Sequence, residues 1–172
     1  MNDFEHNSSP DTRPDSQSNV MSDRAYAEEY TSLVASVPTG NGKRVLVIDD
    51  DPAWVWICKK ILSGLGYKVT GYTCSVEALN FFQIQPRLCD LVITDLNMPV
   101  LDGVTLCKKL LDLRSDLPVI LMTCGDGTIS PDEVEHEGFR ELLLKPTLAN
   151  MLERTVQEVL ATLRDDMEQE NG

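Results

Sequence analysis

The sequence predicts an α/β fold in which a doubly wound parallel sheet is covered by helices on both faces. Strand-like and helix-like segments alternate from about residue 43 onwards and make up five βα units. Several of the strand candidates are near-continuous aliphatic runs, which are typical of parallel strands buried on both faces. Because crossovers between parallel strands are right-handed, helices should lie on both sides of the sheet.

Residues 1–42 are predicted to form a disordered acidic tail. They are rich in Ser, Asp, Asn, Pro and Thr, so they cannot bury enough apolar surface to offset the chain entropy lost on folding. The stretch 24–37 has the composition of a transient helix within this tail. A chain of 172 residues has room for one ordinary domain plus tails. We place the domain at 43–165 and a C-terminal tail at 166–172.

Five short runs of aliphatic residues are the strand candidates. In chain order they are 44–48, 67–72, 90–94, 117–122 and 141–144. Because polar and glycine-containing segments separate them, each run is predicted to be a separate strand.

The helices are predicted from apolar residues that recur every three or four positions. The first begins at Pro52, directs Val55 and Trp56 outward, and has one apolar face formed by Trp54, Ile57, Cys58, Ile61, Leu62 and Leu65. The second begins at Ser75, and the third has an apolar face around Leu106 and Leu110. The fourth begins with a capping box at 130–133, and the last runs from about 148 to 164.

The composition excludes several classes of function. The formal net charge of −13 and the pI near 4.4 argue against direct binding to nucleic acid or to an anionic membrane, since both need a basic surface. No apolar run is long enough to span a bilayer, and the N-terminus lacks the apolar stretch of a secretion signal. The five cysteines are widely spaced and show no metal-binding pattern, so we expect a cytoplasmic protein.

Polar side chains follow four of the predicted strands. Asp49, Asp50 and Asp51 come directly after an aliphatic strand, where three adjacent negative charges call for a positive partner. The other strands end in Thr94 to Asn97, in Thr123 and Cys124, and in Lys145 and Pro146. Ligands of such sheets bind beyond the carboxyl ends of the strands, so one shared site is the simplest explanation.

The chemistry of these residues suits magnesium and phosphate. Carboxylates with a backbone carbonyl or amide oxygen are hard oxygen ligands of the kind that Mg²⁺ prefers. A lysine ammonium and a threonine hydroxyl can contact phosphate oxygens, and a carboxylate can act as the nucleophile in phosphoryl transfer. Asp95 is the acidic residue that follows the predicted central strand.

From about Lys43 to Arg164 the sequence closely resembles the receiver domain of two-component response regulators. The resemblance is carried by VLVIDDDP, DLVITDLNMPVLDG, VILMTC and LLLKP, of which TDLNMPVLDG is the most specific. It implies a flavodoxin-like (βα)5 fold with strand order 2-1-3-4-5. The segment 123–146 is similar to receivers attached to hybrid histidine kinases.

The resemblance also implies a role for individual residues. Asp49 and Asp50 match the acidic pair that holds Mg²⁺, with Asp50 the more direct ligand. Asn97 matches the residue whose backbone carbonyl completes the metal site. Asp95 matches the phosphoacceptor, which is also a metal ligand.

Two more residues match the family's pattern, and two depart from it. Thr123 matches the switch hydroxyl that turns towards the phosphoryl group, and Lys145, followed by a family-typical cis proline, matches the phosphate-binding lysine. Leu142 stands where the family usually has an aromatic residue, and Cys124 stands where Ala, Ser or Gly is common. The usual coupling of a threonine with an aromatic residue therefore does not carry over directly.

The implied function is that of a response regulator. It accepts a phosphoryl group onto Asp95 from a sensor histidine kinase or a histidine phosphotransfer domain, and it signals by a conformational change to a downstream protein that the sequence does not identify. It catalyses only its own phosphorylation and dephosphorylation. No output domain follows the last helix in this sequence, so output is expected through the receiver itself, with a homodimer left open. We also expect the first helix, through Trp56, to help dock the phosphodonor.

Two alternatives stay open at this point. One is a receiver-type interaction scaffold that is not phosphorylated. The other is a magnesium-dependent phosphohydrolase that forms an aspartyl phosphate. That class usually has a second aspartate two residues after the nucleophile, where this chain has Asn97, so the sequence disfavours it.

Overall fold

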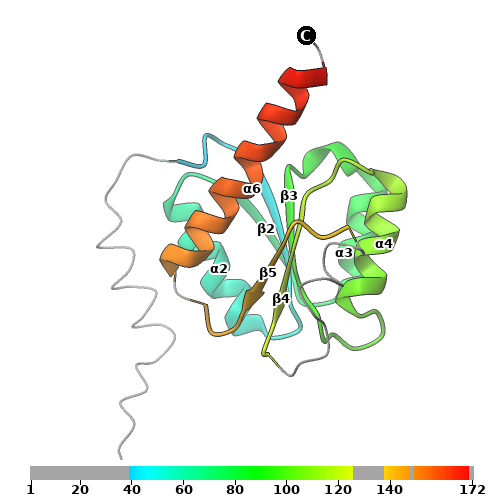
Figure 1. Ribbon diagram of the computed structural model, residues 1–172. Coiled ribbons are helices and arrows are strands. Elements are labelled where there is room, and N and C mark those ends of the chain that lie inside the picture. Colours follow the sequence, from blue (N-terminus) through cyan, green and yellow to red (C-terminus); the bar gives the residue numbers. More distant parts are fainter. Residues whose placement is uncertain (1–38, 126–137, 148, 171–172) are drawn as a thin grey trace, which may run out of the picture.

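The computed structural model describes residues 39–125, 138–147 and 149–170, with the backbone alone for 163–170. These residues form a five-stranded sheet with strand order β2-β1-β3-β4-β5, in which all four neighbouring pairs are parallel. The predicted doubly wound sheet and its strand order are confirmed. Figure 1 shows the sheet between two layers of helices, with α2 and α6 on one face and α3 and α4 on the other.

The strands and helices lie close to their predicted positions. The strands are β1 (Arg44–Ile48), β2 (Lys68–Tyr72), β3 (Leu91–Asp95), β4 (Val119–Thr123) and β5 (Glu141–Leu144). The helices are α2 (Pro52–Gly64), α3 (Ser75–Ile84), the short 3-10 helix η1 (Pro86–Leu88), α4 (Gly103–Leu113) and α6 (Ala149–Glu170). Residues 1–38 of the predicted tail at 1–42, the helix predicted at 24–37 and the helix beginning at 130–133 lie outside the described residues.

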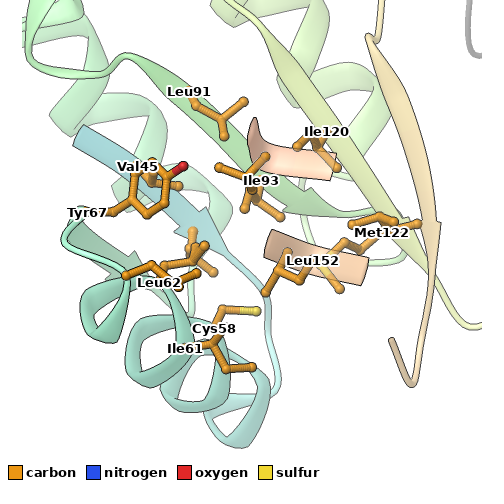
Figure 2. Close-up of a cluster of buried hydrophobic side chains, with 14 of the residues drawn as sticks. Val45, Cys58, Ile61, Leu62, Tyr67, Leu91, Ile93, Ile120, Met122 and Leu152 are labelled. Carbon is orange, nitrogen blue, oxygen red and sulfur yellow. The ribbon is translucent and has the colours of Figure 1, made fainter. Parts of the chain in front are cut away.

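Two apolar clusters, one on each face of the sheet, form the core. The first packs α2 and α6 against β1, β3 and β4, and Figure 2 shows Cys58 and Leu62 of α2 and Leu152 of α6 within it. The second packs α3 and α4 against the same strands and includes Phe82 and Leu110. Because side chains alternate along a strand, each central strand contributes to both clusters, and this explains its near-continuous aliphatic sequence.

Helix α2 buries one residue more than its apolar periodicity predicts. Val55 was expected to face outward, but it is 7% exposed. A β-carbon added to Gly71 of β2 would lie 2.4 Å from the Val55 Cγ1, so the valine fills the space that this glycine leaves open. Trp56, the other residue expected to face outward, is 38% exposed, in agreement with the prediction.

Both ends of the folded unit extend further than predicted. The backbone N–H groups of Gly40 and Gly42 donate to the carbonyls of Leu65 and Gly66, so residues 39–42 pack on the turn between α2 and β2. At the other end α6 continues to Glu170 instead of ending near residue 164, since the sequence between them contains no glycine or proline to stop it. No helix among the described residues is long and apolar enough to cross a membrane.

Candidate functional site

The strand register brings the predicted site residues to one edge of the sheet. Ile48 of β1 pairs with Thr94 of β3, so the next residues, Asp49 and Asp95, lie side by side. Asp95 pairs with Met122 of β4, the residue before Thr123. The N–H of Lys145 donates to the carbonyl of Thr123 at 2.7 Å, which places the end of β5 beside the end of β4. Four strand ends therefore meet in one site.

Lys145 lies between two buried carboxylates. Its Nζ is 2.5 Å from Asp49 Oδ2 and 2.5 Å from Asp95 Oδ1. The three side chains are only 4% to 7% exposed, so all three charges are withdrawn from water. A buried charge is tolerated only when it is paired, and here one ammonium serves two carboxylates. The positive partner that the acidic run at 49–51 requires is, in this structure, a lysine 96 positions after Asp49.

The protonation of this cluster reflects the competition between burial and pairing. Burial raises the pKa of the Asp49 carboxyl, and the hydrogen bond and charge of Lys145 offset only part of that shift. Burial lowers the pKa of Lys145, but hydrogen bonds to Asp49 and Asp95 outweigh it, so the lysine pKa is raised overall. Lys145 is therefore charged at neutral pH, and the charge of Lys145 does not fully offset the cost of burying the Asp49 carboxylate.

Backbone amides hold the outer oxygens of both carboxylates. The N–H of Asp51 donates to Asp49 Oδ1 at 3.0 Å, and the N–H of Asn97 donates to Asp95 Oδ2 at 2.8 Å. Asp51 is itself exposed and caps α2 by accepting a hydrogen bond from the Ala53 N–H. Within the acidic run, Asp49 therefore belongs to the site and Asp51 stabilises the start of α2.

The segment between β3 and α4 turns sharply against Asp95. Val100 has a φ of 71°, and the Leu101 N–H donates to the Pro99 carbonyl at 2.8 Å, which makes a three-residue γ-turn. Asp102 caps α4 by accepting from the Thr105 N–H. A β-carbon on Gly103 would lie 2.2 Å from the Asp95 carbonyl oxygen, so only glycine lets α4 begin this close to the site.

The remaining predicted residues lie around this centre. Thr123 is 3% exposed, and its hydroxyl accepts from the Gly125 N–H at 3.4 Å. Asp50, Asn97 and Cys124 are exposed. Leu142 is half-buried and packs against the second core cluster. The structure joins the side chains of Asp49, Asp95 and Lys145 directly. Asn97 and Thr123 contact this trio through backbone hydrogen bonds, to Asp95 and from Lys145 respectively.

The donor atoms at this edge suit a magnesium ion only in part. Among the described residues no three acidic, histidine or cysteine side chains stand together as a ready set of metal ligands. Lys145 contacts one oxygen of Asp49 and one of Asp95. The formal charges of Asp49, Asp50, Asp95 and Lys145 nevertheless sum to about −2, so this edge of the sheet attracts a cation. Hard carboxylate oxygens with an uncompensated negative charge fit Mg²⁺.

Sequence reasoning missed the place of Trp54 in the site. Its position in the helical pattern assigned it to the core, and it does pack partly against the first cluster. Its ring also lies under the Lys145 ammonium, with the Nζ 5.8 Å from the ring centroid. The signal that could have found it is its position in the first turn of the helix that follows the acidic run.

The sheet order β2-β1-β3-β4-β5 and the lysine between two aspartates at its carboxyl edge place this chain among doubly wound α/β proteins with a charged site at the strand ends. The family model of the response regulator receiver domain matches residues 45–157 of this chain. The chain therefore belongs to the family of response regulator receiver domains of two-component systems.

Individual relatives agree with this assignment. The chain is 39% identical over 119 residues to the two-component response regulator ARR11 of Arabidopsis thaliana, an alignment that covers 69% of this chain and 23% of the relative. It is 37% identical over 118 residues to the two-component response regulator ORR26 of Oryza sativa subsp. japonica, covering 69% of this chain and 20% of the relative. The chain thus spans about a quarter or less of the length of these relatives.

A solved structure supports the fold in the same way. A CheY-like response regulator receiver domain protein from Methanospirillum hungatei matches with a TM-score of 0.64 and 26% sequence identity. The match covers 73% of this chain and 98% of that protein. The architecture of the whole neighbour is therefore present in this chain.

Proposed function

We propose that this protein is a response regulator that accepts a phosphoryl group on Asp95. The observation that carries the proposal is the buried contact of Lys145 with Asp49 and Asp95, each at 2.5 Å. Such a cluster costs stability, since two carboxylates are withdrawn from water for one ammonium. A site that binds and neutralises an incoming phosphate group gives this costly arrangement a use.

The proposed reaction is a direct transfer to the carboxylate. One oxygen of Asp95 attacks the phosphorus of a phosphohistidine; the new P–O bond forms as the P–N bond breaks, and the imidazole nitrogen leaves with the electron pair. The Lys145 ammonium, already beside Asp95, stabilises negative charge on the phosphoryl oxygens. The Thr123 hydroxyl, at the end of the neighbouring strand, can donate to another of these oxygens.

Asp49, Asp50 and Asp95 with the backbone carbonyl of Asn97 would hold Mg²⁺. When bound, the ion would supply positive charge to the phosphoryl oxygens and offset the surplus of carboxylates. The protein's own part is to orient the Asp95 carboxylate, which the Asn97 N–H does at 2.8 Å, and to keep the ammonium in place. The protein would catalyse its own phosphorylation and dephosphorylation and would not turn over an external substrate.

The proposed donors are a sensor histidine kinase or a histidine phosphotransfer domain, and α2 is the proposed docking helix. Trp56 is 38% exposed on this helix, and Lys60 lies over its ring at 5.6 Å. An exposed tryptophan is the residue type that most often anchors a protein contact. If Trp56→Ala leaves the transfer rate from a cognate donor unchanged, the docking role is wrong. We propose a cytoplasmic location, supported by five cysteines that form no disulfide with one another in the structure.

Intact mass after incubation with Mg²⁺ and acetyl phosphate tests the proposal, with wild type beside Asp95→Asn. We expect one added phosphoryl group on wild type, no adduct on the variant, and loss of the adduct when a chelator is present. Asp102→Asn is a matched control, because Asp102 is also an aspartate of the segment near β3 but caps α4 instead of facing Lys145. A folded wild type that takes up no phosphoryl group from acetyl phosphate or from a phosphohistidine donor would refute the proposal and favour the unphosphorylated scaffold.

A further inference from the structure

The Lys145 ammonium has a third neighbour that is not a carboxylate. Its Nζ lies over the ring of Trp54, 5.8 Å from the centroid. A cation is attracted to the face of an aromatic ring within about 6 Å, and the attraction grows when water is excluded. The Lys145 side chain is only 6% exposed, so the contact with Trp54 is of the stronger, desolvated kind.

The same helix offers an internal comparison. Lys60 lies over Trp56 at a similar 5.6 Å, but that tryptophan is exposed, so water screens the pair. The two pairs have nearly the same distance from the ammonium to the ring centroid, and they differ in burial. The Trp54 contact is the one that can hold a lysine in place.

Trp54 is itself held firmly. It lies in the first turn of α2, whose start is fixed by the Asp51 cap, and it packs partly against the first core cluster. A ring fixed on two sides keeps its position when the groups around the ammonium change. Asp49 and Asp95 are the neighbours of Lys145 that would also bind another cation or a phosphoryl group. Trp54 carries no charge, so its contact with the ammonium does not compete with that binding.

We propose that Trp54 is a positioning residue for Lys145, whose ring face keeps the ammonium beside Asp95 when Asp49 is engaged by another cation. The inference rests on the proposed phosphoacceptor function. Asp49 and Asp95 hold the ammonium from one side in this structure. Once Asp49 pairs with another cation, the Lys145 side chain would lose one of its contacts and could adopt more conformations. The ring of Trp54 restricts these conformations and does not compete for the phosphoryl group.

The first test is nuclear magnetic resonance of the lysine side chains in the full chain, with and without Mg²⁺. Protons above a ring face resonate upfield, so the Lys145 ε-protons should move downfield in Trp54→Leu and only partly in Trp54→Phe. Trp56→Leu is the matched control, since it should move the Lys60 signals and leave those of Lys145. Unchanged Lys145 signals in Trp54→Leu would overturn the proposal.

The second test is the rate of phosphorylation by acetyl phosphate over a range of donor concentrations. Trp54→Leu should lower the rate constant at saturating donor roughly 3-fold to 30-fold and leave the half-saturating concentration unchanged, the loss expected for one largely desolvated cation–π contact. Trp54→Phe should recover most of the rate. Equal rates for the leucine and phenylalanine variants would mean that apolar bulk suffices, and this would overturn the proposal.

The two tests separate the failure of this inference from the failure of the proposed function. If wild type takes up no phosphoryl group, the proposed function fails. The inference about Trp54 is then decided by whether the upfield shift of the Lys145 ε-protons in wild type persists when Mg²⁺ is added. If Trp54→Leu does not fold, as judged by urea unfolding, Trp54→Met replaces it as the variant without an aromatic ring.

Discussion

Replacing Lys145 by methionine should destabilise the metal-free protein strongly. Methionine keeps the length and the apolar part of the side chain, so the change removes mainly the ammonium. Asp49 and Asp95 would then face each other at 3% and 5% exposure with no cation between them. Breaking a buried ion pair by removing one partner costs about 3 to 5 kcal/mol, because the remaining charge stays buried without a partner.

Urea unfolding at pH 7 in the presence of a chelator measures this cost. With a slope of about 2 kcal/mol per molar urea, the midpoint of Lys145→Met should fall by about 1.5 to 2.5 M. Lys43→Met is the control. Lys43 is 39% exposed and lies 3.9 Å from Asp90, a surface pair whose loss should cost less than about 1 kcal/mol.

Two conditions should reduce the deficit of Lys145→Met. Added Mg²⁺ should stabilise the variant more than wild type, since no ammonium has to leave Asp49 first. Lower pH should help as well. The pKa of Asp49 is raised in the folded state, and losing Lys145 raises it further, so the folded variant keeps a proton that the unfolded chain releases, and its stability rises as pH falls. A variant as stable as wild type at pH 7 without metal would refute this account of the site.

Three further changes test other parts of the structure by urea unfolding. Val100→Gly should stabilise the protein by about 1 kcal/mol, since it relieves a positive φ on a side chain that is 91% exposed and loses no contact; an unchanged midpoint would contradict the strain. Gly103→Ala should destabilise by about 2 kcal/mol or more, because the new β-carbon meets the Asp95 carbonyl; a neutral result would mean that α4 can shift freely. Hydrogen bonds from Arg44 outweigh burial and lower the pKa of Asp90, so its contribution is complete above about pH 4 and is lost as pH falls through the lowered value. Asp90→Asn should therefore flatten the loss of stability in that acidic range, and a slope equal to that of wild type would contradict the assignment.

Much of the fold could be predicted because its signals are local. Aliphatic runs gave the central strands, and a periodicity of three to four gave α2, α3 and α4. The outward placement of Val55 failed because helical periodicity describes a helix alone, while burial depends on what lies opposite. Here the opposite residue is Gly71, which leaves space for the valine. The end of α6 was misplaced because the prediction relied on a recurring apolar face. The charged residues after 164 have no such face, although they favour a helix.

The clustering of the polar strand-end residues could be predicted from the sequence, but their contacts could not. The polar residues after each strand gave Asp49, Asp95, Thr123 and Lys145, since parallel strands end at a common edge. Which oxygen meets which nitrogen depends on side-chain rotamers that no sequence pattern encodes. The sequence therefore suggested a metal ion as the partner of the acidic run, whereas the structure also assigns that place to Lys145. The contact of the Trp54 ring with Lys145 could not be predicted for the same reason.

The strand register has a practical consequence for engineering this chain. Since the site lies entirely at the carboxyl ends of the strands, a one-residue insertion within β1 or β3 would turn every following side chain to the other face and dismantle it. Extra sequence at the opposite edge meets no such constraint. The exposed turn at Ser115, between α4 and β4, is a place where a fluorescent reporter or a binding tag could be inserted while the chemistry stays out of its reach.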